Sequence, residues 1–247
     1  MFFPLYLDHV SLSVPGLREA VEQLDARLGL SATVSPADPD HHSRVYLDRA
    51  YLEVAAGETV CDWQFSLFFL RFDDPQRLRD HLGSEGFAYR FGSYQGVDGR
   101  WDDVELESGS VPLPILVRRT DPPDVAANWP PPLRVPHRCG ARTLEAVHVA
   151  VPELSAAAAT YGRLLGTESV AGLDEAGLPC ATFELASGVI VLSQGALPGI
   201  AAIVLGVASL AEAAKVVGPL ADGRTAWLDA AAAHGLRVGL TQVRGST

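Results

Sequence analysis

The sequence carries one pattern twice, as LDHVSLSVPGL at residues 7–17 and as LEAVHVAVPEL at residues 144–154. Polar and apolar residues alternate up to a Val-Pro corner, which is typical of a half-buried strand. Apolar residues then recur at helical spacing in both copies, as Leu17, Val21, Leu24, Leu28 and Leu154, Ala157, Tyr161, Leu165. Gly29 and Gly166 follow where helices commonly end in glycine. Each copy therefore predicts a strand, a corner and a helix.

Extended stretches follow each of these helices, near residues 31–34, 44–48 and 50–55 and near residues 168–171, 180–186 and 189–193. Two weaker copies fill the remaining sequence. One has a strand at residues 65–72 and a helix start at Asp73-Asp74-Pro75, with proline in the first turn. The other has a strand at residues 200–207, Ser209 as helix N-cap and a helix over residues 210–217. The sequence thus predicts an α+β protein of four βαβββ modules.

A proline-rich stretch separates the second module from the third. It runs from Asp121-Pro122-Pro123 through Pro130-Pro131-Pro132 to about Gly140, and such proline density favours an extended spacer. We therefore predict an N-terminal domain at residues 1–120, a linker at 121–140 and a C-terminal domain at 141–247.

Composition and charge exclude several classes of function. The net charge of −11 and the absence of a basic cluster argue against a nucleic-acid partner. The longest apolar run, residues 199–208, is about half of the ~20 residues that a membrane helix needs. Three widely spaced cysteines, Cys61, Cys139 and Cys180, form no zinc or disulfide pattern. We expect a cytoplasmic protein with no membrane span.

Tandem βαβββ modules with His in a first strand and Glu in a last strand resemble the vicinal oxygen chelate superfamily of glyoxalases, bleomycin-resistance proteins and extradiol dioxygenases. The stretches LDHV at 7–10 and YLEV at 51–54 resemble its glyoxalase-like domain group. The resemblance implies that two modules pack into a cup of eight strands around a small-molecule ligand. In superfamily enzymes, a divalent metal in the cup is held by His and Glu from the first and last strands.

Strand alternation predicts which side chains face this cup. Val10, Leu12 and Val14 would pack on the helix, so His9, Ser11 and Ser13 would face the ligand, as would Glu53 in the last strand. His9 and Glu53 are chemically suited to zinc, nickel, manganese or iron(II), but the residues equally allow a hydrogen-bonded buried pair. We add His42 and Arg44 as substrate contacts, because the family pattern carries polar residues there.

The second module departs from the family pattern. Leu67 stands at the position of His9, and the strand at residues 113–119 has no carboxylate, with Arg118 near the second Glu position. A site of His9, Glu53 and Arg118 would suit an anionic ligand, which Arg can bind in bidentate fashion. When the third module is aligned with the first, Ala146 takes the position of His9 and His148 takes the position of Ser11. The C-terminal half is therefore predicted to be a degenerate structural copy.

Three functions follow from these residues. The first is a metal-dependent lyase or isomerase in which His9, Glu53 and His42 or a water hold the metal, and a carboxylate such as Glu53 shuttles a proton. The second is a metal-free protein that sequesters a small polar or anionic molecule, with Trp63 either in an aromatic wall or in the core. The third is assembly, for example as a homodimer. Extradiol cleavage is disfavoured because it needs a second His.

Overall fold

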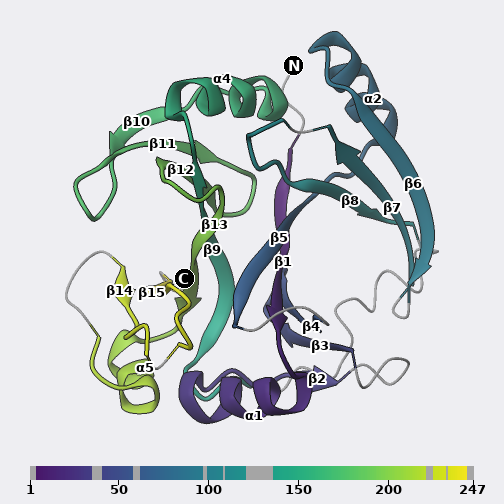
Figure 1. Cartoon of the computed structure of the whole chain (residues 1–247). Helices are drawn as coiled ribbons and strands as arrows, with labels where there is room; N and C mark the ends of the chain where they lie inside the picture. Colours follow the sequence, from purple (N-terminus) through teal and green to yellow (C-terminus); the bar gives the residue numbers. More distant parts are fainter. Residues whose placement is uncertain are drawn as a thin grey trace. The chain divides into compact units, whose positions relative to one another are not determined.

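The computed structural model describes residues 4–34, 41–57, 62–96, 99–107, 109–120, 136–220, 225–231 and 233–243. The first module consists of β1 (Tyr6–Val14), α1 (Leu17–Leu28), β2 (Thr33–Val34), β3 (His42–Tyr46) and β4 (Tyr51–Ala56). The second consists of β5 (Gln64–Arg71), α2 (Pro75–Ser84), β6 (Tyr89–Gly96), β7 (Gly99–Leu106) and β8 (Ile115–Arg119). Both modules follow the predicted βαβββ order (Figure 1).

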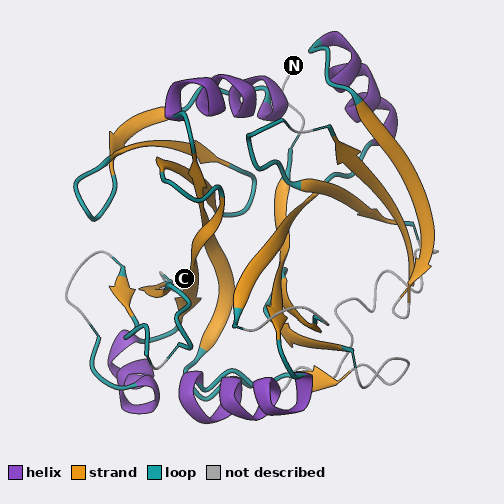
Figure 2. Cartoon of the chain, viewed as in Figure 1, coloured by secondary structure: helices purple, strands orange, loops and turns teal. Residues whose placement is uncertain are grey.

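The third module consists of β9 (Ala141–Val151), α4 (Leu154–Leu165), β10 (Val170–Leu173), β11 (Pro179–Glu184) and β12 (Val189–Gln194). The fourth consists of β13 (Gly199–Val207), α5 (Leu210–Val217), β14 (Ala226–Trp227) and β15 (Val238–Gln242). Figure 2 shows each helix beside the strands of its own module. The predicted α+β class is therefore confirmed.

The strands form two mixed sheets. The first sheet has eight strands in the order β2-β3-β4-β1-β5-β8-β7-β6. The second has seven strands among the described residues, in the order β10-β11-β12-β9-β13-β15-β14. In each sheet the first strands of two modules are neighbours at the centre, so each half of the chain forms its own sheet, as the repeat predicts.

Glycine ends the two matching helices. Gly29 after α1 has φ 63° and Gly166 after α4 has φ 64°, the left-handed conformation that favours glycine. At the other end, Asp74 accepts hydrogen bonds from Gln76 N and Arg77 N to cap α2. Ser209 accepts one from Glu212 N to cap α5. The helix boundaries predicted from the apolar spacing are confirmed.

Contacts between Cα atoms divide the chain into two compact units that combine modules from both halves. One unit comprises Met1–Asp8, Leu67–Ala126 and Ala146–Ala201, and the other comprises His9–Ser66, Ala127–Glu145 and Ala202–Thr247. The second unit therefore joins the first and fourth modules. The domain boundaries predicted at residues 120 and 140 stay a prediction.

The predicted linker falls mainly on residues 121–135, which lie outside the described residues. Its last residues contact the first module. His137 Nε2 lies 2.8 Å from the carbonyl oxygen of Tyr46, and Cys139 N donates to Gly29 O. Residues 136–140 are thus anchored to a module rather than extended in solvent. None of the helices in the described ranges is long and apolar enough to cross a membrane.

Candidate functional site

Three neighbouring strands of the first module place polar side chains on one face. Strand β4 pairs with β1 in parallel and with β3 antiparallel. Alternation sends the intervening residues to the other face, where Val10, Leu12, Val45, Leu52 and Val54 are buried. Because α1 buries Leu17, Ala20, Leu24 and Leu28, the apolar face is the one that the helix covers. We call the polar one the β1–β3–β4 face.

The β1–β3–β4 face carries three rows of side chains, set by the strand register. The rows are His9, Tyr51 and Tyr46, then Ser11, Glu53 and Arg44, then Ser13, Ala55 and His42. All the residues predicted for the site in this module therefore share one face. The apolar/polar alternation was the signal that found them.

Glu53 is at the centre of this face. Its Oε2 accepts a hydrogen bond of 2.8 Å from Ser11 Oγ. Its Oε1 lies 3.7 Å from His42 Nδ1 and 3.8 Å from Arg44 Nη2. The side chain of Glu53 is 19% exposed, and that of His42 is 42% exposed. The carboxylate is thus fixed by a hydroxyl and flanked by nitrogen groups, yet remains within reach of solvent.

His9 is in an aromatic environment. Its ring stacks on Tyr51, with ring centroids 4.3 Å apart and an interplanar angle of 11°. Arg44 Cζ lies 5.1 Å from the centroid of the same Tyr51 ring. Tyr51 is two residues before Glu53, so the same alternation predicts it on this face, although it was not among the predicted site residues. His9 and Tyr51 form a flat wall beside the Glu53 cluster.

The donor set tests whether this face suits a divalent metal of the kind that the fold family uses. Within the part of the chain that the structure describes, no three His, Cys, Asp or Glu side chains come together in a way that could hold a metal ion. Glu53 instead has the Arg44 guanidinium beside it, a cation that competes with a metal for the carboxylate. In the second module, Leu67 takes the position of His9; it is 46% exposed and provides no ligand atom. These residues do not fit a divalent metal.

Arg118, predicted as a ligand contact, is bound elsewhere. It pairs across β7 and β8 with Asp102, and its Nη2 donates to Asp102 Oδ2 at 2.8 Å. Ser93 Oγ donates to the other oxygen, Asp102 Oδ1, at 2.6 Å. Alternation puts Arg118 on the same face of β8 as Leu116, which is fully buried. The charge of Arg118 therefore serves the buried Asp102, a partner that the sequence reading did not identify.

The third module lacks the equivalent cluster. Its register pairs Ala146 with Val189 and His148 with Val191. Since β1 and β4 pair His9 with Tyr51 and Ser11 with Glu53, Val191 stands at the position of Glu53. The third module thus has valine in place of the carboxylate and alanine in place of His9, and its histidine, His148, takes the position of Ser11.

No family model and no curated protein matches the sequence. Solved structures match over nearly the whole chain. The 2,3-dioxygenase LapB from Pseudomonas sp. KL28 has a TM-score of 0.70 at 15% identity, covering 99% of this chain and 94% of that one. The Mn(II)-bound glyoxalase from Novosphingobium aromaticivorans has a TM-score of 0.67 at 12% identity, covering 98% of this chain and 83% of that one. A hypothetical protein from Staphylococcus aureus has a TM-score of 0.69 at 10% identity, covering 97% of this chain and 99% of that one.

At these identities the likeness concerns the fold and not the reaction. Three βαβββ modules, a fourth that has two strands after its helix among the described residues, and two mixed sheets with neighbouring first strands agree with it. The chain has the vicinal oxygen chelate fold of the glyoxalases and extradiol dioxygenases.

Proposed function

We propose that this protein binds a small polar, anionic molecule on the β1–β3–β4 face without the help of a divalent metal. One observation carries the proposal: Glu53 accepts a hydrogen bond from Ser11 and has the Arg44 guanidinium, a cation, 3.8 Å from its other oxygen, with His42 beside it. A guanidinium and an imidazole beside a hydrogen-bonded carboxylate provide both donors and an acceptor. A hydroxycarboxylate could use both kinds of group at once.

The burial of the cluster supports this proposal. The Arg44 side chain is only 12% exposed, so its charge is less screened by water than that of a surface arginine. His42 is more exposed and lies at the open side of the cluster. A carboxylate that approaches from solvent would meet His42 first and then Arg44. The stacked His9 and Tyr51 rings are buried, at 6% and 5% exposed, and Arg44 packs over the Tyr51 ring, which helps to fix the guanidinium.

Metal-dependent lyase or isomerase activity is the second candidate. It is favoured by the placement of His9 and Glu53 on the same face of two paired strands, in adjacent rows. A metal held there would need His9, Glu53 and a further ligand, for which the sequence suggests His42 or a water. Such a metal would polarise a substrate oxygen when bound.

Calorimetric titration with small carboxylates tests the proposal. The tag-free chain is titrated with acetate, lactate, malonate and salicylate in buffer that contains EDTA. We expect saturable binding of a hydroxycarboxylate, and Arg44→Gln should weaken it about tenfold, since a charge-assisted hydrogen bond is lost. Arg49→Gln, an exposed arginine in the turn between β3 and β4, is the matched control and should bind as the wild type does.

Two results would contradict the proposal. The first is that none of the four carboxylates binds even at millimolar concentration. The second is that binding disappears in EDTA and returns when Mn²⁺ or Zn²⁺ replaces the chelator, which would support the metal-dependent candidate.

A further inference from the structure

A pocket lies beside the start of α1. It has a volume of about 370 Å³ and is lined by Glu19, Gln23, Asp62, Trp63 and His234. Its residues come from α1, from the segment before β5 and from the segment before β15, all within the same compact unit. We call it the α1 pocket. None of its residues belongs to the β1–β3–β4 face.

Two stacked rings form one wall of the α1 pocket. The Trp63 and His234 rings have centroids 4.2 Å apart and an interplanar angle of 15°. The backbone of His234 has φ 54°, and no other described residue except glycine has a positive φ. Such a conformation is unfavourable for a residue with a side chain and often marks a functional position. The strained backbone presents the imidazole to Trp63.

Two buried polar atoms in this pocket have no hydrogen-bond partner. They are Gln23 Oε1 and His234 Nε2. The Gln23 amide orientation is fixed, because its Nε2 donates to Glu19 Oε1 at 2.6 Å and the flipped amide would set two acceptor oxygens against each other. Leaving a buried acceptor unsatisfied is unfavourable. A ligand that donates a hydrogen bond to Gln23 would remove this cost.

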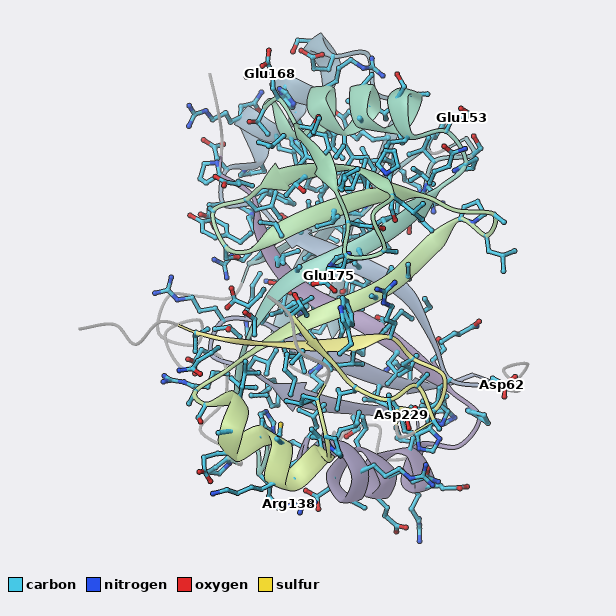
Figure 3. All side chains as sticks on the ribbon, turned by 90° about the vertical axis from the view of Figure 1, so that its left-hand side faces the viewer. Asp62, Arg138, Glu153, Glu168, Glu175 and Asp229 are labelled. Carbon is cyan, nitrogen blue, oxygen red and sulfur yellow. The ribbon has the colours of Figure 1, made fainter. Side chains whose placement is uncertain are left out.

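The charges around the pocket favour a cation. Glu19 and Asp62 both line it with carboxylates and both are exposed; Figure 3 shows Asp62 at the surface. Burial lowers the pKa of His234, and the charge of Arg27 lowers it further, against the opposing effect of Glu19. The lowered pKa favours the neutral imidazole, which does not repel a cation. The guanidinium of Arg27 is directed to the carbonyl of Ala231.

We propose that the α1 pocket is a binding site for a small organic ammonium ion. The ammonium group donates to Gln23 Oε1 and is neutralised by Glu19, while its alkyl part lies against the Trp63 ring. An aromatic face and carboxylates are a common combination for holding such ions. The volume is within the range of small-ligand pockets. This site is independent of the one proposed on the β1–β3–β4 face.

Calorimetric titration of the full chain with butylammonium and tetramethylammonium chloride tests this proposal, with sodium chloride as the ionic control and sodium acetate as the anionic control. We expect butylammonium to bind in a saturable way and more tightly than tetramethylammonium, which has no N–H to donate. Gln23→Leu removes the acceptor and should weaken butylammonium about tenfold. Glu22→Gln, an exposed residue on the same helix, is the matched control and should change nothing.

His234→Gly provides a second variant, because it removes the ring while relieving the positive φ. It should retain the fold, as judged by circular dichroism, and lose binding of both ammonium ions. Glu53→Gln should leave ammonium binding intact, which separates this site from the β1–β3–β4 face. The proposal is overturned if butylammonium binds no better than sodium, if acetate binds in its place, or if Gln23→Leu and Glu22→Gln bind it alike.

Discussion

Ser11 Oγ donates a hydrogen bond of 2.8 Å to Glu53 Oε2 across the paired strands β1 and β4. The donor residue is 5% exposed, so the bond is shielded from water. One carboxylate oxygen, Oε2, is therefore fixed by a side chain of the neighbouring strand. The other, Oε1, faces His42 and Arg44. This arrangement fixes the acceptor at the centre of the proposed ligand site.

Removing the Ser11 hydroxyl should destabilise the fold modestly. Ser11→Ala leaves Glu53 Oε2 without this donor, and we expect the free energy of unfolding to fall by about 1 kcal/mol. Urea unfolding followed by circular dichroism measures it. Ser13→Ala is the matched control, because Ser13 pairs with Ala55 and not with a carboxylate. An equal loss of stability in both variants would show that the Ser11–Glu53 bond contributes nothing of its own.

The two helix-ending glycines should differ in their tolerance of alanine. Both have φ near 64°, so each substitution costs about 1 kcal/mol of backbone strain. At Gly29 a Cβ would also lie 2.6 Å from Val216 Cγ1 and 2.8 Å from Cys139 N, whereas at Gly166 its nearest neighbour is His81 Cε1 at 3.5 Å. We expect Gly29→Ala to lower the free energy of unfolding by a further 1–3 kcal/mol or so. Thermal and urea unfolding measure both losses. If Gly29→Ala and Gly166→Ala lower the free energy of unfolding equally, the close packing at Gly29 is contradicted.

His137 should make stability depend on pH. Ser31 N donates to its Nδ1 at 3.1 Å, so Nε2 carries the proton and donates to Tyr46 O. Burial lowers the pKa of His137 below its ordinary 6.5, although the hydrogen bond to Tyr46 opposes this shift. As pH falls below 6.5 the unfolded chain takes up a proton that the folded chain does not, and stability decreases.

The variant His137→Gln isolates this effect. Urea midpoints at pH 7.5 and pH 5.5 should differ more for the wild type than for the variant, since only the wild type loses stability through this histidine. A variant with the same or a larger drop between the two pH values would contradict the assignment.

Arg118 should matter for stability and not for ligand binding. Arg118→Ala leaves the carboxylate of Asp102, which is only 11% exposed, without its cation. Because the Arg118 side chain is 30% exposed and water screens part of the interaction, we expect a loss of about 1–2 kcal/mol rather than the larger value of a fully buried pair. A double-mutant cycle with Asp102→Asn measures the coupling. A tenfold loss of carboxylate affinity in Arg118→Ala would instead support the ligand-binding role predicted from the sequence.

The fold could be predicted from the sequence because its signals are local and repeated. The alternation in residues 7–14 and the helical spacing that ends at Gly29 each depend on neighbours in the chain, and the second copy at residue 144 repeats them. The register of β4 between β1 and β3 then brings Glu53 to Ser11 and Arg44, as period-two alternation requires.

What the sequence could not predict depends on pairing between distant strands. Arg118 was assigned to the ligand site from its position in the strand, but the β7–β8 register sets it opposite Asp102. The His234–Trp63 stack joins residues far apart in the chain, and no apolar periodicity in the sequence predicts it. Predicting either contact requires knowing which strands and segments are neighbours.

Metal content tests the metal-independent site most directly. The tag-free chain is dialysed against Zn²⁺, Ni²⁺, Mn²⁺ and Fe²⁺ in turn, and the bound metal is measured by elemental analysis beside His9→Ala and Glu53→Gln. With Arg44 beside Glu53 and no group of three His, Cys, Asp or Glu side chains placed to hold a metal among the described residues, we predict substoichiometric metal that is the same in all three proteins. One metal ion per wild-type chain, lost in both variants, would contradict the proposed function.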